Sequence, residues 1–284
     1  MSVKIIADST CDLSPELIKK YNISIIPLHI VLGELEYKDG LEISPDEIYE
    51  WSNSKKESPK TSAASISDAI EIFDKHLKET DEIVCFSISG QMSTTVNVLR
   101  MAAEELEAED RIHIIDSENL STGGGLMVIE ASIMASEGKN AKEIVEKIEQ
   151  LKPHVRASFI VDTLTFLHRG GRCSGVAALA GGALKLHPKI IVENGAMKPD
   201  KKYRGKMNSA ILSYVKDLEP QIKNAKSDRV FITHSGCDNE IIQTIYQYVE
   251  ELEYFKEILI TRAGGVISSH CGPGTLGVLF IENI

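Results

Sequence analysis

The segment 82–97, EIVCFSISGQMSTTVN, constrains the fold of this chain more than any other stretch. The apolar run Ile83 to Phe86 predicts a buried strand, and a helix follows after a short turn. In a parallel sheet, such a turn lies at the carboxyl end of its strand, where free N–H groups and the helix dipole favour an anion. Ser93 and Thr94 would offer hydroxyl donors to that anion. They would also serve as ordinary helix caps, and this stretch alone allows both interpretations.

Similar strand-to-helix units recur along the first half of the chain. Strands are predicted at 3–7 and 111–115, and each precedes polar turn residues and a helix. This alternation predicts a parallel sheet covered by helices on both faces. We place a domain boundary near Pro153, so that an N-terminal α/β/α domain spans 1–155 and a C-terminal α/β domain spans 156–284. Two domains suit a chain of 284 residues, because single domains usually contain roughly 100–150.

Two further stretches of the first half carry residues suited to a ligand. The run 53–65 has no apolar period, and it predicts that Thr61 and Ser62 lie at a helix N-terminus. Thr61 and Ser62 would converge with the residues at 87–95 on one ligand if the strands that precede these two segments are neighbours. The alternative is that the two segments are independent helix caps. The triple glycine 123–125 would form a loop able to cradle phosphate, but neither a GxGxxG fingerprint nor a P-loop lysine accompanies it.

The second half contains three unusual segments. A helix of small residues is predicted at 176–184, where tight packing explains the composition better than a passing ligand. The basic run 198–206 is predicted to be a surface loop. A glycine-rich loop after residue 264 is predicted to hold His270 before the last strand.

Charge and cysteine content limit the classes of protein. The formal charge of −11 argues against a nucleic acid or an anionic membrane as partner. The five cysteines are scattered and never spaced as CxxC, so neither a disulfide framework nor a zinc site is indicated. We also expect no metal ion and no cofactor. The N-terminus lacks the regions of a signal peptide, and no run is long enough to span a bilayer. We therefore expect a cytoplasmic protein without stable membrane insertion.

Six short motifs follow one another along the chain: DSTCDL at 8–13, PL at 27–28, KTSAAS at 60–65, SISGQMSTT at 87–95, VDTLTFLHRGGR at 161–172 and HCGPGTLG at 270–277. Together they resemble the DegV family of bacterial fatty-acid-binding proteins. The resemblance implies a two-domain α/β fold with one long-chain fatty acid in a tunnel between the domains. It also implies a carrier without catalysis of its own, which presents the carboxylate to a dihydroxyacetone-kinase-like fatty acid kinase for acyl-phosphate formation in phospholipid synthesis.

The resemblance assigns the head group to particular residues. Thr61 or Ser62, Ser93 with Thr94, and His270 become the candidates for contacts with the fatty acid carboxylate. A carboxylate removed from water needs several hydrogen-bond donors, and hydroxyl groups supply them without a fixed charge. A single histidine is also commonly structural, and that alternative stays open. Each buried CH₂ of the acyl chain would add roughly 0.8 kcal/mol of affinity.

The sequence departs from the family pattern at two places. Gln91-Met92 stands where the family often has a threonine and an aromatic residue, which leaves the local tunnel shape open. Cys173-Ser174-Gly175 replaces the Ile-Ser-Lys that usually follows RGGR, which removes a basic residue near the mouth.

Basic residues concentrate between 185 and 206 and in the RGGR motif. We expect Arg169, Arg172, Lys202 and Arg204 to dock an acidic face of the kinase near the tunnel mouth. A solvated basic loop without a partner is the alternative.

Two enzymatic interpretations compete with the carrier. A serine hydrolase would combine Ser93 and His270 with Asp116 or Asp162, but Ser93 lies in GQMSTT and not in GxSxG. A dihydroxyacetone-kinase-like enzyme would need a metal-binding carboxylate cluster and a phosphate loop, and the sequence shows neither plainly.

Overall fold

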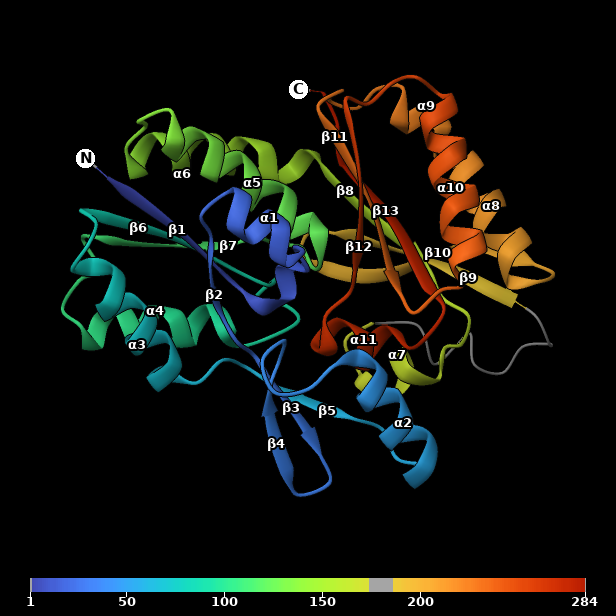
Figure 1. The fold of residues 1–284 in the computed structure, drawn as a ribbon, viewed down its shortest axis with the longest axis horizontal. Helices are drawn as coiled ribbons and strands as arrows, with labels where there is room; N and C mark the ends of the chain where they lie inside the picture. The colour runs from blue at the N-terminus through green and yellow to red at the C-terminus, as the bar shows by residue number, and fades with distance from the viewer. Residues whose placement is uncertain (1, 174–185, 284) are drawn as a thin grey trace.

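The computed structural model of the protein describes residues 2–173 and 186–283. Its strands form a four-stranded sheet, a six-stranded sheet and a small three-stranded sheet, with helices packed around them (Figure 1). The small-residue helix predicted at 176–184 lies outside the described residues.

The four-stranded sheet is parallel throughout, as the alternation of strands and helices predicts. Its order is β2-β1-β6-β7, with bounds β1 Val3–Asp8, β2 Ser24–Ile26, β6 Glu82–Ser87 and β7 Ile112–Asp116. Side chains of β6 alternate between two hydrophobic cores: Ile83 and Cys85 join one, and Val84 and Phe86 join the other. Because both faces are buried, these strands have continuous apolar sequences.

Helices cover both faces of this sheet (Figure 1). Helices α3 (Ile66–Leu77) and α4 (Thr95–Glu105) lie on one side, and α5 (Thr122–Ser136) and α6 (Ala141–Leu151) lie on the other. Capping residues define several helix starts. Ser14 caps α1 (Pro15–Lys20), and capping boxes begin α2 (Pro45–Lys55) and α6.

The six-stranded sheet has the order β10-β9-β8-β13-β11-β12 and is antiparallel except between β11 and β12. Its strands are β8 Val155–Ile160, β9 Leu186–Glu193, β10 Ala196–Arg204, β11 Arg229–Ser235, β12 Glu257–Arg262 and β13 Thr275–Ile281. Helices α8 (Met207–Asp217), α9 (Glu219–Ile222) and α10 (Asn239–Glu251) pack on one face.

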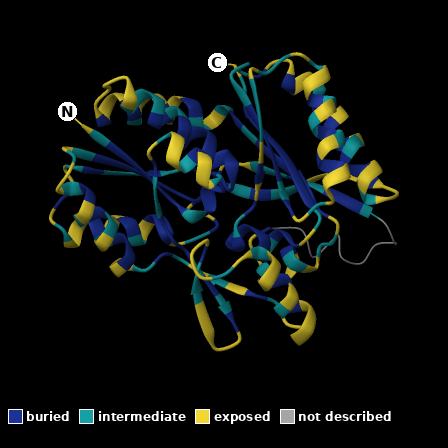
Figure 2. Ribbon diagram, viewed as in Figure 1, coloured by how far each residue is buried: buried dark blue, intermediate teal, exposed yellow. Residues whose placement is uncertain are grey.

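Helix α5 lies between the two large sheets and contacts strands of both. Phe231 and Leu279 of the six-stranded sheet share a hydrophobic core with Ile5 of the four-stranded sheet and with Met127 of α5. Figure 2 shows buried residues concentrated in α5 and the strands, and exposed residues on the outer faces of the peripheral helices. The two parts are therefore joined through one apolar core, and the division after residue 155 stays a prediction.

The small sheet has the order β4-β3-β5, with bounds β3 His29–Leu32, β4 Leu35–Lys38 and β5 Lys60–Ser62. Helix α11 (Gly265–Cys271) contacts β3 and β5, and it also contacts α2 and α7 (Thr165–Gly170). Two single 3-10 turns, Ser9–Cys11 and Lys152–His154, complete the described helices. The short helix α11 thus connects the C-terminal part of the chain to the small sheet (Figure 1).

Three segments predicted as loops or helix starts were assigned wrongly. Thr61 and Ser62 lie in β5, where Thr61 pairs with Ile30, and α3 begins only after its cap Ser65. The basic run 198–206 is mostly strand, because 196–204 forms β10 against β9. His270 lies in helix α11 and not in a loop.

The glycines 123–125 were also predicted wrongly to lie in the loop before a helix. They form the first turn of α5 and are buried. A Cβ atom at Gly125 would lie 2.7 Å from the carbonyl oxygen of Cys11, so the glycine permits close packing of the helix. Packing, and not a ligand, accounts for this triplet.

Candidate ligand-binding site

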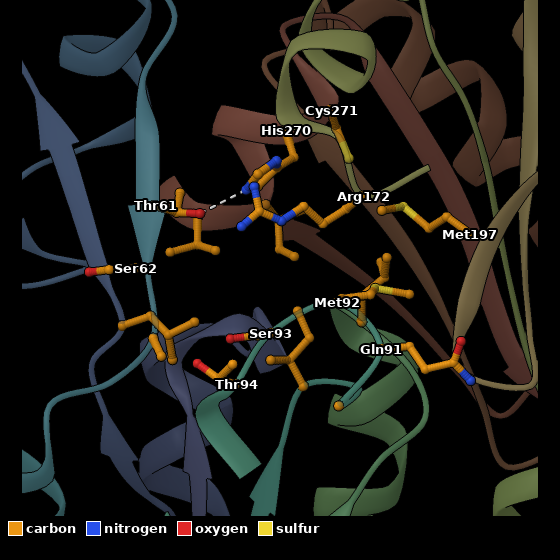
Figure 3. Close-up of a pocket in the computed structure, with 17 residues that line it drawn as sticks. Thr61, Ser62, Gln91, Met92, Ser93, Thr94, Arg172, Met197, His270 and Cys271 are labelled. Carbon is orange, nitrogen blue, oxygen red and sulfur yellow. Dashed lines mark hydrogen bonds between the residues drawn. The ribbon is translucent and has the colours of Figure 1, made fainter. Parts of the chain in front are cut away.

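A cavity of about 450 Å³ lies where the small sheet, helix α11 and the loop after β6 meet (Figure 3). This volume falls within the range of small-molecule sites, roughly 300–1,000 Å³. Apolar side chains provide much of the wall, including Leu28, Ile88, Met92, Leu120, Met197 and Ile267. The polar lining contains Thr61, Ser62, Gln91, Ser93, Thr94, Arg172 and His270. The five predicted head-group residues therefore line one cavity, although β5 is not a neighbour of β6.

A hydrogen bond between Thr61 and His270 crosses the polar end of the cavity. It joins Thr61 Oγ1 to His270 Nε2 at 2.8 Å, and the two residues are 209 positions apart in the chain. His270 Nδ1 is buried and has no hydrogen-bond partner among the described residues. Burial, together with the positive charge of Arg172, lowers the pKa of His270 to about 4. The imidazole is therefore neutral at pH 7.

The neutral imidazole determines which partner donates in the bond between Thr61 and His270. A neutral ring carries one N–H, and a buried N–H without an acceptor is the more costly orphan. We therefore assign the proton to Nε2, which donates it to Thr61 Oγ1. Thr61 accepts that bond and keeps its own hydroxyl proton for donation to another group. The cavity thus contains a hydroxyl that is free to donate to an acceptor.

Ser93 and Thr94 lie across the cavity from this pair (Figure 3). Ser93 Oγ lies 2.8 Å from Thr95 Oγ1 and accepts a hydrogen bond from the backbone N–H of Thr95 at 3.2 Å. Thr94 is the N-cap residue of α4, is exposed, and makes no side-chain capping bond. Ser93 thus acts as a local cap and lines the cavity, so both interpretations of this stretch describe part of its geometry.

Ser62 differs from Thr61 although both line the cavity. Its side chain is exposed, and its hydroxyl donates to Glu36 Oε1 at 3.2 Å. Figure 3 shows this hydroxyl pointing away from Thr61. Thr61 is therefore the better placed of the two for a ligand in the cavity.

The four predicted docking residues have different surroundings. Arg172 lines the cavity and donates to the carbonyl oxygen of Gly170 at 2.7 Å. Arg169 donates to Ser58 Oγ at 3.1 Å. Lys202 and Arg204 are exposed on the edge strand β10. Neighbouring lysines are paired with acids: Lys189 with Asp200, Lys198 with Glu193 and Lys201 with Asp217.

Two contacts that sequence reasoning missed close one side of the cavity. Ser89 Oγ donates to the carbonyl oxygen of Gly195, and Gln91 Nε2 donates to that of Asn194, each at 2.6 Å. Asn194 and Gly195 have positive φ values of 50° and 78°, as a tight hairpin turn requires. The Asn-Gly pair could have indicated this turn, but nothing in the sequence identifies its distant partners.

The hydrolase arrangement is not formed among the described residues. His270 Nδ1, the atom that a triad carboxylate would contact, has no such partner there. Asp116 accepts hydrogen bonds from the N–H groups of Gly90 and Glu118, and Asp162 lies 3.4 Å from His187 Nδ1. Within 2–173 and 186–283, no group of three or more His, Cys, Asp or Glu is arranged to hold a metal ion. No helix in those ranges is both long and apolar enough to cross a membrane.

Comparison with known sequences gives matches along the whole chain. A family model described as "Uncharacterised protein, DegV family" matches residues 2–283. A DegV domain-containing protein of Deinococcus radiodurans is 30% identical over 278 residues, which cover 98% of each chain. A second, from Clostridium perfringens, is 32% identical over 284 residues, which cover 99% of this chain and 98% of the relative.

Solved structures agree with this chain in fold. A DegV family protein from Thermus thermophilus, described for its fatty acid binding, has a TM-score of 0.90 at 31% identity and covers 100% of both chains. A stearic acid-binding protein from Eubacterium ventriosum has a TM-score of 0.85 at 29% identity and covers 99% of this chain and 98% of its own. The predicted fold class, a parallel α/β/α sheet with a second α/β sheet unit, is confirmed.

The low pKa of His270 predicts a pH-dependent difference in stability between wild type and His270→Asn. The unfolded state binds this proton near pH 6.5, whereas the folded state binds it only near about 4. The stability due to the neutral ring is therefore fully present above pH 6.5 and is lost as the pH falls towards 4. The free energy of unfolding of wild type should exceed that of the variant most at pH 7, and the difference should shrink as the pH falls. Urea unfolding of both proteins at pH 7, 5.5 and 4 measures this, and a constant difference would contradict the low pKa.

Proposed function

The chain belongs to the DegV family, and we propose that it binds one long-chain fatty acid, with the carboxylate at the Thr61–His270 end of the cavity. The hydrogen bond between these two residues carries the proposal, because with Nε2 as the donor it leaves the hydroxyl proton of Thr61 available to an acceptor in the cavity. The relatives from Thermus thermophilus and Eubacterium ventriosum, described as binding fatty acids, support the ligand class.

Thr61 and Ser93 face each other across the space that the carboxylate would occupy (Figure 3). A carboxylate accepts several hydrogen bonds at once, and each bond to a charged group is worth about 1.5–3 kcal/mol. Arg172 adds a positive charge at the same end of the cavity. Two hydroxyl donors beside one arginine suit a monoanion better than a neutral head group.

The apolar part of the cavity would hold the acyl chain. Burial of a sixteen-carbon chain yields on the order of 10 kcal/mol before the costs of ordering and association. We place the predicted tunnel inward from the head group, past Leu120, Ile267 and Cys271. These three residues also line a further void of about 30 Å³ beside the six-stranded sheet. Side chains there would have to shift to admit a long chain.

We further propose that the protein is a cytoplasmic carrier and not an enzyme. It would present the carboxylate to a dihydroxyacetone-kinase-like fatty acid kinase, which forms the acyl phosphate for phospholipid synthesis. Arg172 lines the cavity and has an exposed side chain, which supports access by a partner at this end. Arg169, also exposed, precedes it in the RGGR motif. Lys202 and Arg204 would extend the same docking surface along β10.

Ser93→Ala should weaken fatty acid binding by about 1–3 kcal/mol, because the buried carboxylate loses one donor. Ser87→Ala is the matched control, since the Ser87 hydroxyl donates to the carbonyl oxygen of Ile88 and does not line the cavity. Titration of both variants with palmitate gives the comparison. Equal affinities would contradict the proposed head-group site.

Charge reversal at Lys202 and Arg204 should slow phosphorylation of bound fatty acid by the kinase and make the rate less sensitive to salt. Fatty acid binding should not change, because neither side chain lines the cavity. Reversal at Lys142 and Lys147, exposed on α6, is the control with the same change in net charge. Unchanged rates at low salt would remove β10 from the docking surface, and loss of lipid binding would show that the two residues are structural.

A further inference from the structure

Helix α11 is attached to the small sheet at both of its ends. At its C-terminal end, His270 bonds to Thr61 of β5. At its first residue, the N–H of Gly265 donates to Asp39 Oδ1 at 2.7 Å. Asp39 directly follows β4, and its own N–H donates to the carbonyl oxygen of Leu28 ahead of β3. The same small sheet therefore fixes both the start of α11 and the histidine near its end.

A second carboxylate holds the preceding N–H group from another direction. Asp12, in the turn after β1, accepts from the N–H of Gly264 at 2.8 Å. The remaining oxygens are also bonded: Ser9 donates to Asp39 at 2.8 Å, and Ser121 donates to Asp12. Asp12 and Asp39 are 5% and 2% exposed, so these bonds are shielded from water. Buried and fully bonded carboxylates of this kind fix geometry closely.

Gly265, the first residue of α11, lets the start of the helix pack directly on its neighbours, and this packing restricts where the helix can lie. A Cβ atom on Gly265 would collide with Ile30 and would lie 2.8 Å from Cδ1 of Ile48. The helix start therefore packs directly on β3 and α2, and it has no room for displacement towards them. With only seven residues, α11 has little stability of its own, and its neighbours determine where it lies.

We propose that Asp39, assisted by Asp12, is a positioning residue for the ligand head group: it places α11 so that His270 donates to Thr61 and leaves the Thr61 hydroxyl free to donate to a carboxylate. This inference rests on the proposed fatty acid binding and deepens it. According to this inference, a carboxylate outside the cavity gives the site its preference for an ionised head group over a neutral one. Neither aspartate lines the cavity, so the effect must act through α11.

Palmitate and hexadecan-1-ol test the inference, because they share a chain length and differ in the head group. Asp39→Ala should lower the preference for palmitate by about tenfold, the effect of about one lost hydrogen bond to a charged group, with little change for the alcohol. Asp39→Asn should retain most of the preference, since its amide oxygen can still accept from Gly265. Glu130→Ala is the control: it removes the ion pairs that link α5 to Lys226 and Arg229 at the start of β11, away from α11. It should keep the preference of wild type.

A second measurement follows the histidine without any ligand. In Asp39→Ala, NMR titration should show the pKa of His270 rising from about 4 towards its ordinary value of about 6.5, because the ring leaves its buried position. Glu130→Ala should leave the pKa unchanged. If Asp39→Ala does not fold, Gly265→Ala displaces the same helix start and should give both effects.

Two results would overturn the inference. One is an equal loss of affinity for acid and alcohol in Asp39→Ala, which would make Asp39 merely structural. The other is an unchanged pKa of His270 in that variant. If wild type binds neither lipid, the proposed function fails, and the titration of His270 alone then decides whether Asp39 positions the histidine.

Discussion

The hydrogen bonds that fix α11 are the constraint on which the cavity depends. This helix supplies His270 together with Val266, Ile267 and Cys271 of the cavity wall. A helix of seven residues is too short to be stable alone, so the carboxylates of Asp12 and Asp39 and the packing around Gly265 decide its position. Distant parts of the chain must therefore be in place before the site has its shape.

The large sheets provide the rigid frame around this short helix. Helix α5 packs on both sheets, and residues from both belong to one hydrophobic core. The apolar strands of the parallel sheet are buried on both faces, which holds the loop after β6 firmly at their carboxyl ends. Ser93 lies in that loop, whereas Thr61 and His270 come from elements with few local interactions. The site thus combines one donor from a rigid frame with a pair that depends on long-range contacts.

Sequence patterns predicted the elements whose signals are local. The strand-turn-helix unit at 82–97 is confirmed, because apolar periodicity acts over a few residues. The strand at 60–62 and the helix at 265–271 were missed, because three or seven residues carry no period and acquire their structure from tertiary partners. Motif resemblance brought Thr61 and His270 together as candidates. Their direct bond, and the roles of Asp39 and Gln91, require the three-dimensional structure.

The most direct test of the account is mass spectrometry of lipid extracted from the purified protein. A long-chain fatty acid, close to one molecule per chain, is the predicted result, since burial of the acyl chain should make release slow. An extract without fatty acid, together with no uptake of added palmitate or oleate, would contradict the account.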